Sequence, residues 1–210
     1  MNKRKTGILF FAVLTAALLT TAAAMQWEQQ TLADKLIRLH VIANSDSEED
    51  QALKLQVRDT MLELTQLQVN GRDEARTSLV QLLPDIQKAA EDCLREQGCE
   101  DPVEVTLGLE SYPTRVYDNF ALPAGNYQSL RIVIGEGKGE NWWCVVFPSI
   151  CFRATMGDLE EAAQAAGFTD GEIRLITENP DGYALKFKSW ELLLKLKQIL
   201  FRRNLPGWKS

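Results

Sequence analysis

The stretch Leu36-Ile-Arg-Leu-His-Val-Ile-Ala43, followed by Asn44-Ser-Asp-Ser47 and Glu48-Glu-Asp50, decides the fold class. In 36–43 every second residue is apolar, namely Ile37, Leu39, Val41 and Ala43, which predicts a strand with one fully apolar face. The short polar side chains that follow, Ser45 among them, supply oxygens that cap a helix, and the acids suit the positive end of the helix dipole. A strand therefore leads directly into a helix. The apolar positions of that helix have helical spacing: Leu53, Val57, Met61 and Leu64.

Further helical segments follow. One is expected at 73–97, where Pro84 should kink or split the helix and Gly98 should end it. A short helix is expected at 157–166, and a strand at 172–177.

Alternating residues predict three more strands, at 103–109, 127–134 and 142–147. The last two are joined by Gly135-Glu-Gly-Lys-Gly139, which suits a tight turn, so we expect them to be antiparallel neighbours. The predicted fold is α+β, with a single antiparallel or mixed sheet of about four to five strands and helices packed on one face.

The N-terminus is typical of an export signal. Lys3, Arg4 and Lys5 precede an uncharged run over 7–24, which ends in small residues that suit a cleavage site. The competing interpretation is an uncleaved anchor, because a membrane span needs about 17–25 apolar residues. Both interpretations, a cleaved signal and an uncleaved anchor, place most of the protein outside the cytoplasm. We therefore expect a signal peptide or anchor at 1–24, one globular domain at 25–185 and a separate C-terminal segment at 186–210.

Charge separates that C-terminal segment from the domain. Removing the three basic residues of the leader changes the net charge from −6 to −9, which argues against a nucleic-acid partner. Residues 186–210 hold seven basic residues and one acid, a local +6, which leaves −15 on residues 25–185. An amphipathic helix is predicted at 187–203, suited to an anionic membrane surface, although its apolar side could equally pack onto the sheet. Its apolar side would hold Phe187, Trp190, Leu194 and Ile199, bordered by Lys188, Lys195 and Arg202.

Four cysteines in an exported chain permit disulfides. Three connectivities are formally possible, and proximity in the sequence favours Cys144 with Cys151 and, more weakly, Cys93 with Cys99.

Candidate catalytic and metal sites are weak. His40 is the only histidine, which excludes zinc sites built on paired histidines. A Cys144–His40 nucleophile pair needs a contact that sequence spacing does not establish, and a structural histidine beside a disulfide-bonded cysteine is the alternative. Ser45 lies in no nucleophile elbow, the glycine run lacks the Ser or Thr of a phosphate loop, and the acids near Asp46 lack the central glycine of a calcium loop. We expect no catalytic residue, metal or cofactor.

Trp142 and Trp143 are consecutive strand residues, so their side chains face opposite ways. One ring can enter the core while the other stays near the surface, where a large amphipathic ring commonly anchors a partner. The alternative is that the domain covers both rings.

Three parts of the sequence carry a resemblance: Leu36–Asp46 with Asp50–Asp59, Leu122–Tyr127 leading into Leu130–Gly135, and Gly137–Pro148 continuing to Cys151-Phe152. The third contains Asn141-Trp-Trp-Cys-Val-Val-Phe-Pro148, which is rich in rare residues. Together they resemble the stage II sporulation protein R family. One departure is Ser149, where the family would have a second proline.

The resemblance implies a non-enzymatic signalling protein that is exported into the intermembrane space of the sporangium. There it would activate a membrane-bound protease, the sigma-E processing peptidase, so that the sigma-E precursor is cleaved in the mother cell. The expected partners are this protease and a membrane surface. The residues expected to contact a partner are Trp142, Trp143, Asn141, His40 and Asp46. The alternative is a secreted envelope hydrolase that uses Cys144 or a carboxylate.

Overall fold

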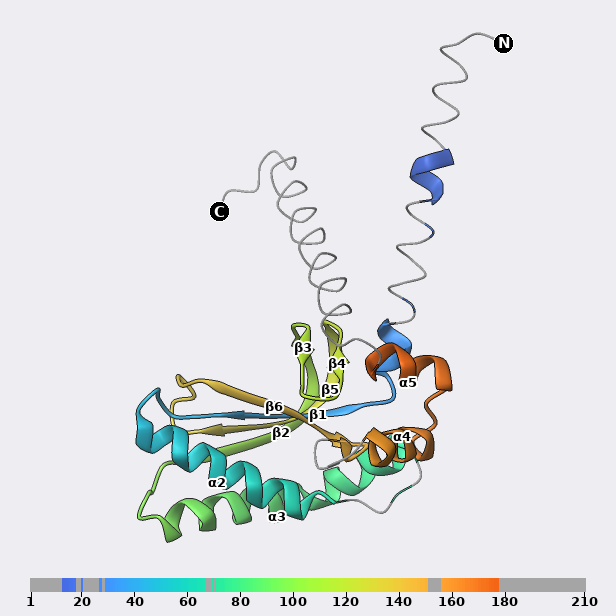
Figure 1. The fold of residues 1–210 in the computed structure, drawn as a ribbon. Coiled ribbons are helices and arrows are strands. Elements are labelled where there is room, and N and C mark those ends of the chain that lie inside the picture. Colours follow the sequence, from blue (N-terminus) through green and yellow to red (C-terminus); the bar gives the residue numbers. More distant parts are fainter. Residues whose placement is uncertain are drawn as a thin grey trace, which may run out of the picture.

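The computed structural model describes residues 13–17, 20, 27, 29–66, 69, 71–150 and 156–177. Figure 1 shows the elements along the chain. Their order is β1 (Ile37–Ile42), α2 (Glu48–Leu64), α3 (Arg72–Glu96), β2 (Val103–Tyr112), β3 (Arg115–Val116), β4 (Ala121–Leu122), β5 (Gly125–Ile134), β6 (Asn141–Phe147), α4 (Met156–Ala165) and α5 (Asp170–Thr177).

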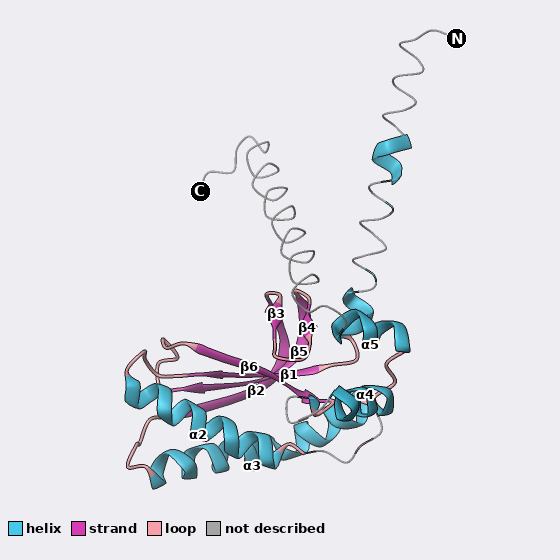
Figure 2. Ribbon diagram, in the orientation of Figure 1, coloured by secondary structure: helices cyan, strands magenta, loops and turns pink. Residues whose placement is uncertain are grey.

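Four strands form one mixed sheet in the order β2-β5-β1-β6 (Figure 2). β1 is parallel to β5 and antiparallel to β6, and β2 is antiparallel to β5. The short strands β3 and β4 form a separate hairpin. The predicted α+β class and mixed sheet are confirmed.

The predicted pairing of 127–134 with 142–147 is wrong, because β1 lies between β5 and β6. All six residues of β1 are buried, and a strand buried on both faces fits best in the sheet interior, where both of its edges form hydrogen bonds. The glycine run therefore crosses the end of β1 instead of closing a hairpin. In that crossing the amide of Lys138 donates to the Asn44 carbonyl at 3.0 Å, and the amide of Gly139 donates to the Ala43 carbonyl at 2.9 Å.

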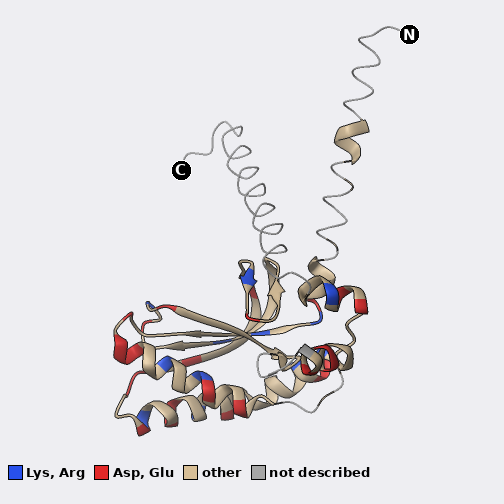
Figure 3. Cartoon of the chain, in the orientation of Figure 1, with Lys and Arg blue, Asp and Glu red and all other residues tan. Residues whose placement is uncertain are grey.

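The cap of helix α2 lies two residues after Ser45. It is Ser47, whose hydroxyl accepts the backbone N–H of Asp50 at 3.1 Å. Ser45 instead donates its hydroxyl to the Asp50 carboxylate, so its predicted capping role is wrong. Figure 3 shows red acidic segments at the start of this helix, where the first turn carries three acids.

Helix α3 is continuous through Pro84, so the proline does not split it. The helix ends as predicted at Gly98, whose φ of 77° suits glycine. The amide of Cys99 then donates back to the Leu94 carbonyl at 3.0 Å and closes the helix end.

The strand expected at 172–177 is wrong, because this segment belongs to helix α5. Thr169 and Glu172 form a capping box: the Glu172 carboxylate accepts the Thr169 amide at 2.7 Å, and the Thr169 hydroxyl accepts the Glu172 amide at 3.3 Å. The short helix predicted at 157–166 is confirmed as α4.

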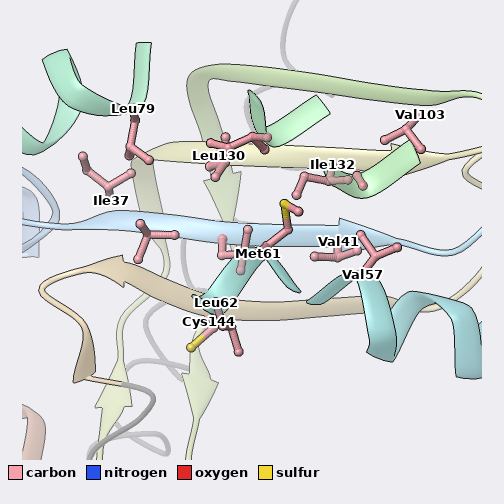
Figure 4. Close-up of a cluster of buried hydrophobic side chains, with 14 of the residues drawn as sticks. Ile37, Val41, Val57, Met61, Leu62, Leu79, Val103, Leu130, Ile132 and Cys144 are labelled. Atoms are coloured by element: carbon pink, nitrogen blue, oxygen red, sulfur yellow. The ribbon is translucent and has the colours of Figure 1, made fainter. Parts of the chain in front are cut away.

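Two apolar clusters lie on opposite faces of the sheet. Helices α2 and α3 lie side by side under one face and cover the helix-side core, which contains Val41, Val57 and Met61 (Figure 4). The second cluster, on the far face, includes Tyr127 and Leu122 and packs residues of the hairpin, α4 and α5 against one end of the sheet. Helix packing on one face is therefore confirmed, while the far face has a partial cover of its own.

The leader and the C-terminal segment fall largely outside the described residues. The signal peptide, its cleavage and the helix predicted at 187–203 therefore stay predictions. Of the helices in the described ranges, none has both the length and the apolar character needed to cross a membrane.

Candidate partner-binding site

Polar side chains gather on the far face of the sheet. Because Ile37, Leu39 and Val41 of β1 face the helices, Arg38 and His40 must face the other way. The set of side chains around them, buried or half-buried except for the exposed Asn141, is called here the polar cluster. Its members are Arg38, His40, Glu110, Tyr112, Tyr117, Ser129 and Asn141.

Both ring nitrogens of His40 are engaged. Nδ1 lies 2.8 Å from a carboxylate oxygen of Glu110, and Nε2 lies 2.7 Å from the side-chain oxygen of Asn141. The ring also lies against Trp143, with centroids 5.4 Å apart. His40 therefore ties β1 to β2 and to β6 across the sheet.

Arg38 is the largest fully buried side chain of the described residues, with 0% of its surface exposed. Its Nε donates to the Cys144 carbonyl at 3.0 Å, and Nη2 donates to the Tyr117 hydroxyl at 2.6 Å. The guanidinium carbon lies 4.3 Å from the ring centroid of Tyr112 and 5.0 Å from that of Tyr127. Nη1 is buried and has no acceptor. Aromatic rings and two hydrogen bonds thus hold a cation that forms no ion pair within the described part of the chain.

The tyrosines of the cluster stay protonated. Burial raises the pKa of Tyr112 and of Tyr117 above the usual value, although the charge of Arg38 opposes this rise. The Tyr112 hydroxyl shares a hydrogen bond of 2.7 Å with the Ser129 hydroxyl. These hydroxyl groups therefore remain hydrogen-bond donors at neutral pH.

The structure brings together three of the five residues predicted to contact a partner: His40, Asn141 and Trp143. Trp142 lies on the helix side, where the guanidinium of Arg58 is 5.1 Å from its ring. Asp46 lies at the end of the sheet and accepts the Glu140 amide at 2.7 Å. Both tryptophans are half-buried, one on each face of β6.

Several members of the cluster were not predicted from the sequence. Arg38 had a usable signal, because the alternation of 36–43 already placed it beside His40 on the less apolar face. Glu110 and Tyr112 lie beyond residue 109, where the predicted strand ended, whereas β2 continues to Tyr112.

The geometry separates Cys144 from His40. Cys144 belongs to the helix-side core, where Figure 4 shows its sulfur among core side chains, whereas the His40 ring is bonded on the far face. A nucleophile and its base must be within hydrogen-bond reach, so these two residues do not form the pair considered from the sequence.

The predicted disulfide between Cys93 and Cys99 is wrong, because both are free thiols. The turn that ends α3 holds the backbone of Cys99 against Leu94, and both cysteines pack separately against the helix-side core. Burial raises the pKa of the Cys99 thiol. Cys151 lies outside the described residues, so its bond with Cys144 stays a prediction.

The part of the sequence that forms this site is similar to that of known proteins. The sequence model of the stage II sporulation protein R family matches residues 33–156. The chain belongs to the stage II sporulation protein R family. A curated relative, Stage II sporulation protein R of Bacillus subtilis (strain 168), is 37% identical over 153 residues, which cover 69% of this chain and 68% of that protein. No solved structure matches the chain.

The stretch matched to the family contains the whole sheet and both long helices. Every member of the polar cluster lies within it. The candidate site is therefore built entirely from the segment that the family model describes, and a sporulation role follows from that membership.

Proposed function

We propose that this protein is an exported signal of sporulation that activates the membrane-bound sigma-E processing protease across the intermembrane space. The sigma-E precursor would then be cleaved in the mother cell. The observation that carries the proposal is membership of the stage II sporulation protein R family over the segment that forms the sheet and its polar cluster. On this proposal the protein acts by binding and catalyses no reaction itself.

The geometry of the polar cluster supports binding over turnover. A general base needs a free nitrogen or oxygen directed at the proton that it removes. Both nitrogens of His40 are already engaged, by Glu110 and Asn141. The alternative, an envelope hydrolase acting through Cys144, is disfavoured because that cysteine is 1% exposed and lies on the other face of the sheet.

Co-production in a heterologous bacterium tests the proposal. The full chain, the protease and the sigma-E precursor are produced together, and precursor cleavage is followed by immunoblot. Cleavage that requires this chain supports activation. Cleavage of equal extent without this chain, or cleavage by this chain when the protease is omitted, contradicts it.

A further inference from the structure

A pocket of about 330 Å³ lies beside β6, the strand at one edge of the sheet. Its walls come from three parts of the chain: the hairpin with Tyr117 and Phe120, the edge strand with Trp143, and α4 with Leu159. Asp118 also lines the pocket, but it is exposed and forms no ion pair with an arginine in the described part of the chain. The pocket therefore has a mixed lining, with apolar and aromatic side chains beside the polar Asp118 and Asn119.

Two arginines, Arg38 and Arg115, lie against Tyr117 and Trp143 of the pocket lining, and neither is paired with a described acid. Arg38 bonds to Tyr117, and the guanidinium of Arg115 lies 3.4 Å from the ring centroid of Trp143. Burial lowers the pKa of Arg115, and the nearby charge of Arg38 lowers it further. Each arginine has one buried nitrogen without an acceptor, Nη1 in Arg38 and Nε in Arg115. Neither forms an ion pair with a described acid.

Arg38 is fully buried and Arg115 is half-buried. Like charges in such a surrounding are costly unless an opposite charge joins them, because a low dielectric strengthens both repulsion and attraction. Tyr117 connects this charge to the pocket. Its hydroxyl accepts a hydrogen bond from Arg38, which polarises the O–H bond, and its own proton has no acceptor in the described part of the chain. An anion that reached this hydroxyl would gain a hydrogen bond and the attraction of both guanidinium groups.

We propose that the pocket binds the carboxylate of an Asp or Glu side chain, flanked by apolar residues, on a peptide segment of the partner protein. The apolar part of the lining favours a peptide over a small hydrated ion, because flanking apolar side chains would cover the exposed Val116 and the half-buried Trp143. The inference rests on the proposed function only in taking that partner to be the protease.

A peptide-binding measurement tests the site without the protease. The full chain, in a non-ionic detergent at low salt, is titrated into fluorescein-labelled Gly-Phe-Asp-Phe-Gly and its Asn counterpart, and fluorescence anisotropy is recorded. The Asp peptide should bind at least about tenfold more tightly, the effect expected for a charge-assisted hydrogen bond. Equal affinity for the two peptides would overturn the proposal.

Variants locate the binding. Tyr117→Phe and Arg115→Gln should each reduce the preference for the Asp peptide by about tenfold. Arg58→Gln is the matched control, because Arg58 stacks on Trp142 on the other face of the same strand, and it should keep the full preference. An unchanged preference in both Tyr117→Phe and Arg115→Gln, with unfolding midpoints like that of the parent, would also overturn the proposal. Since the assay contains no protease, its result is independent of whether the proposed activation is correct.

Discussion

Replacing Gly139 by Ala tests how the loop between β5 and β6 is fixed over the end of β1. A Cβ atom built at Gly139 would lie 2.6 Å from the Ser45 carbonyl carbon and 2.8 Å from the Ala43 side chain, and closer still to the Ser45 oxygen. Non-bonded carbon atoms prefer about 3.5–4.0 Å, so the loop would have to move by roughly 1 Å. The Ser45 carbonyl group belongs to the backbone, so it cannot rotate away from a new Cβ atom as a flexible side chain can.

The free energy of unfolding should fall by about 2–4 kcal/mol. Forcing atoms into a packed site costs about 1–3 kcal/mol. The same movement strains the hydrogen bond from the Gly139 amide to the Ala43 carbonyl, which has a length of 2.9 Å, and such a bond contributes about 1 kcal/mol. With a urea dependence of about 2 kcal/mol per molar, the midpoint should fall by roughly 1–2 M.

Gly108→Ala is the matched control, because a Cβ at Gly108 in β2 would meet nothing within 4 Å. Its free energy of unfolding should stay within about 0.5 kcal/mol of the parent. Urea unfolding of the full chain, followed by tryptophan fluorescence, measures both variants. If the two variants have the same midpoint, Gly139 is not in close contact with the β1–α2 connection and the reasoning is refuted.

Four further outcomes are expected. His40→Leu should lower the free energy of unfolding by about 1–3 kcal/mol in urea titrations, because it removes the hydrogen bonds to Glu110 and Asn141 and leaves Glu110 with the longer 3.6 Å ion pair to Arg131; an unchanged midpoint would contradict the observed hydrogen bonds. A hydrogen bond from Ser45 lowers the pKa of Asp50 in the folded state. This carboxylate therefore stabilises the fold above its unfolded pKa of roughly 4, and the stabilisation is lost as the pH falls through the lower folded pKa. The difference in unfolding free energy between the parent and Asp50→Asn should shrink on acidification below about pH 4, and a constant difference would argue against the shift. Thiol titration of the unreduced, denatured chain should find two thiols, Cys93 and Cys99, if the predicted bond between the other two cysteines forms, and four thiols would exclude that bond. The full chain should sediment with anionic vesicles at low salt more strongly than a chain ending at Ala184, and equal sedimentation would exclude a membrane role for the basic C-terminal segment.

Local patterns in this chain predict local structure well. The β1 strand and the start of α2 follow from alternation and from clustered cap residues within a dozen positions, and these signals act over neighbouring residues. The missed α5 shows the same principle, because its capping box at Thr169 and Glu172 is visible in the sequence. The strand expected at 172–177 ignored this cap signal, and the cap agreed with the structure.

Strand order and the site could not be predicted in this way. Consecutive strands usually pair, yet here β1 takes the position between β5 and β6 because it is the strand buried on both faces. The site depends on that insertion. His40 bonds to Glu110 and Asn141, which lie 70 and 101 positions away in the chain, and no local pattern specifies such contacts.

The position of Arg38 is not explained by stability. An isolated buried cation is unfavourable, and replacing buried ionic groups by apolar residues of similar size is often neutral or stabilising by about 1–4 kcal/mol. Apolar side chains do fit on the same face of the sheet beside Arg38, since Leu36 and Val145 are fully buried in the far-face cluster. Three tyrosine rings hold this arginine, and one of its nitrogens lacks an acceptor. The proposed binding of a partner therefore explains its position better than stability does. Its hydrogen bond to Tyr117 directs the positive charge toward the edge of the sheet where we propose that a partner binds. The buried charge lowers the stability of the fold, and the packing of the helix-side core compensates for this loss.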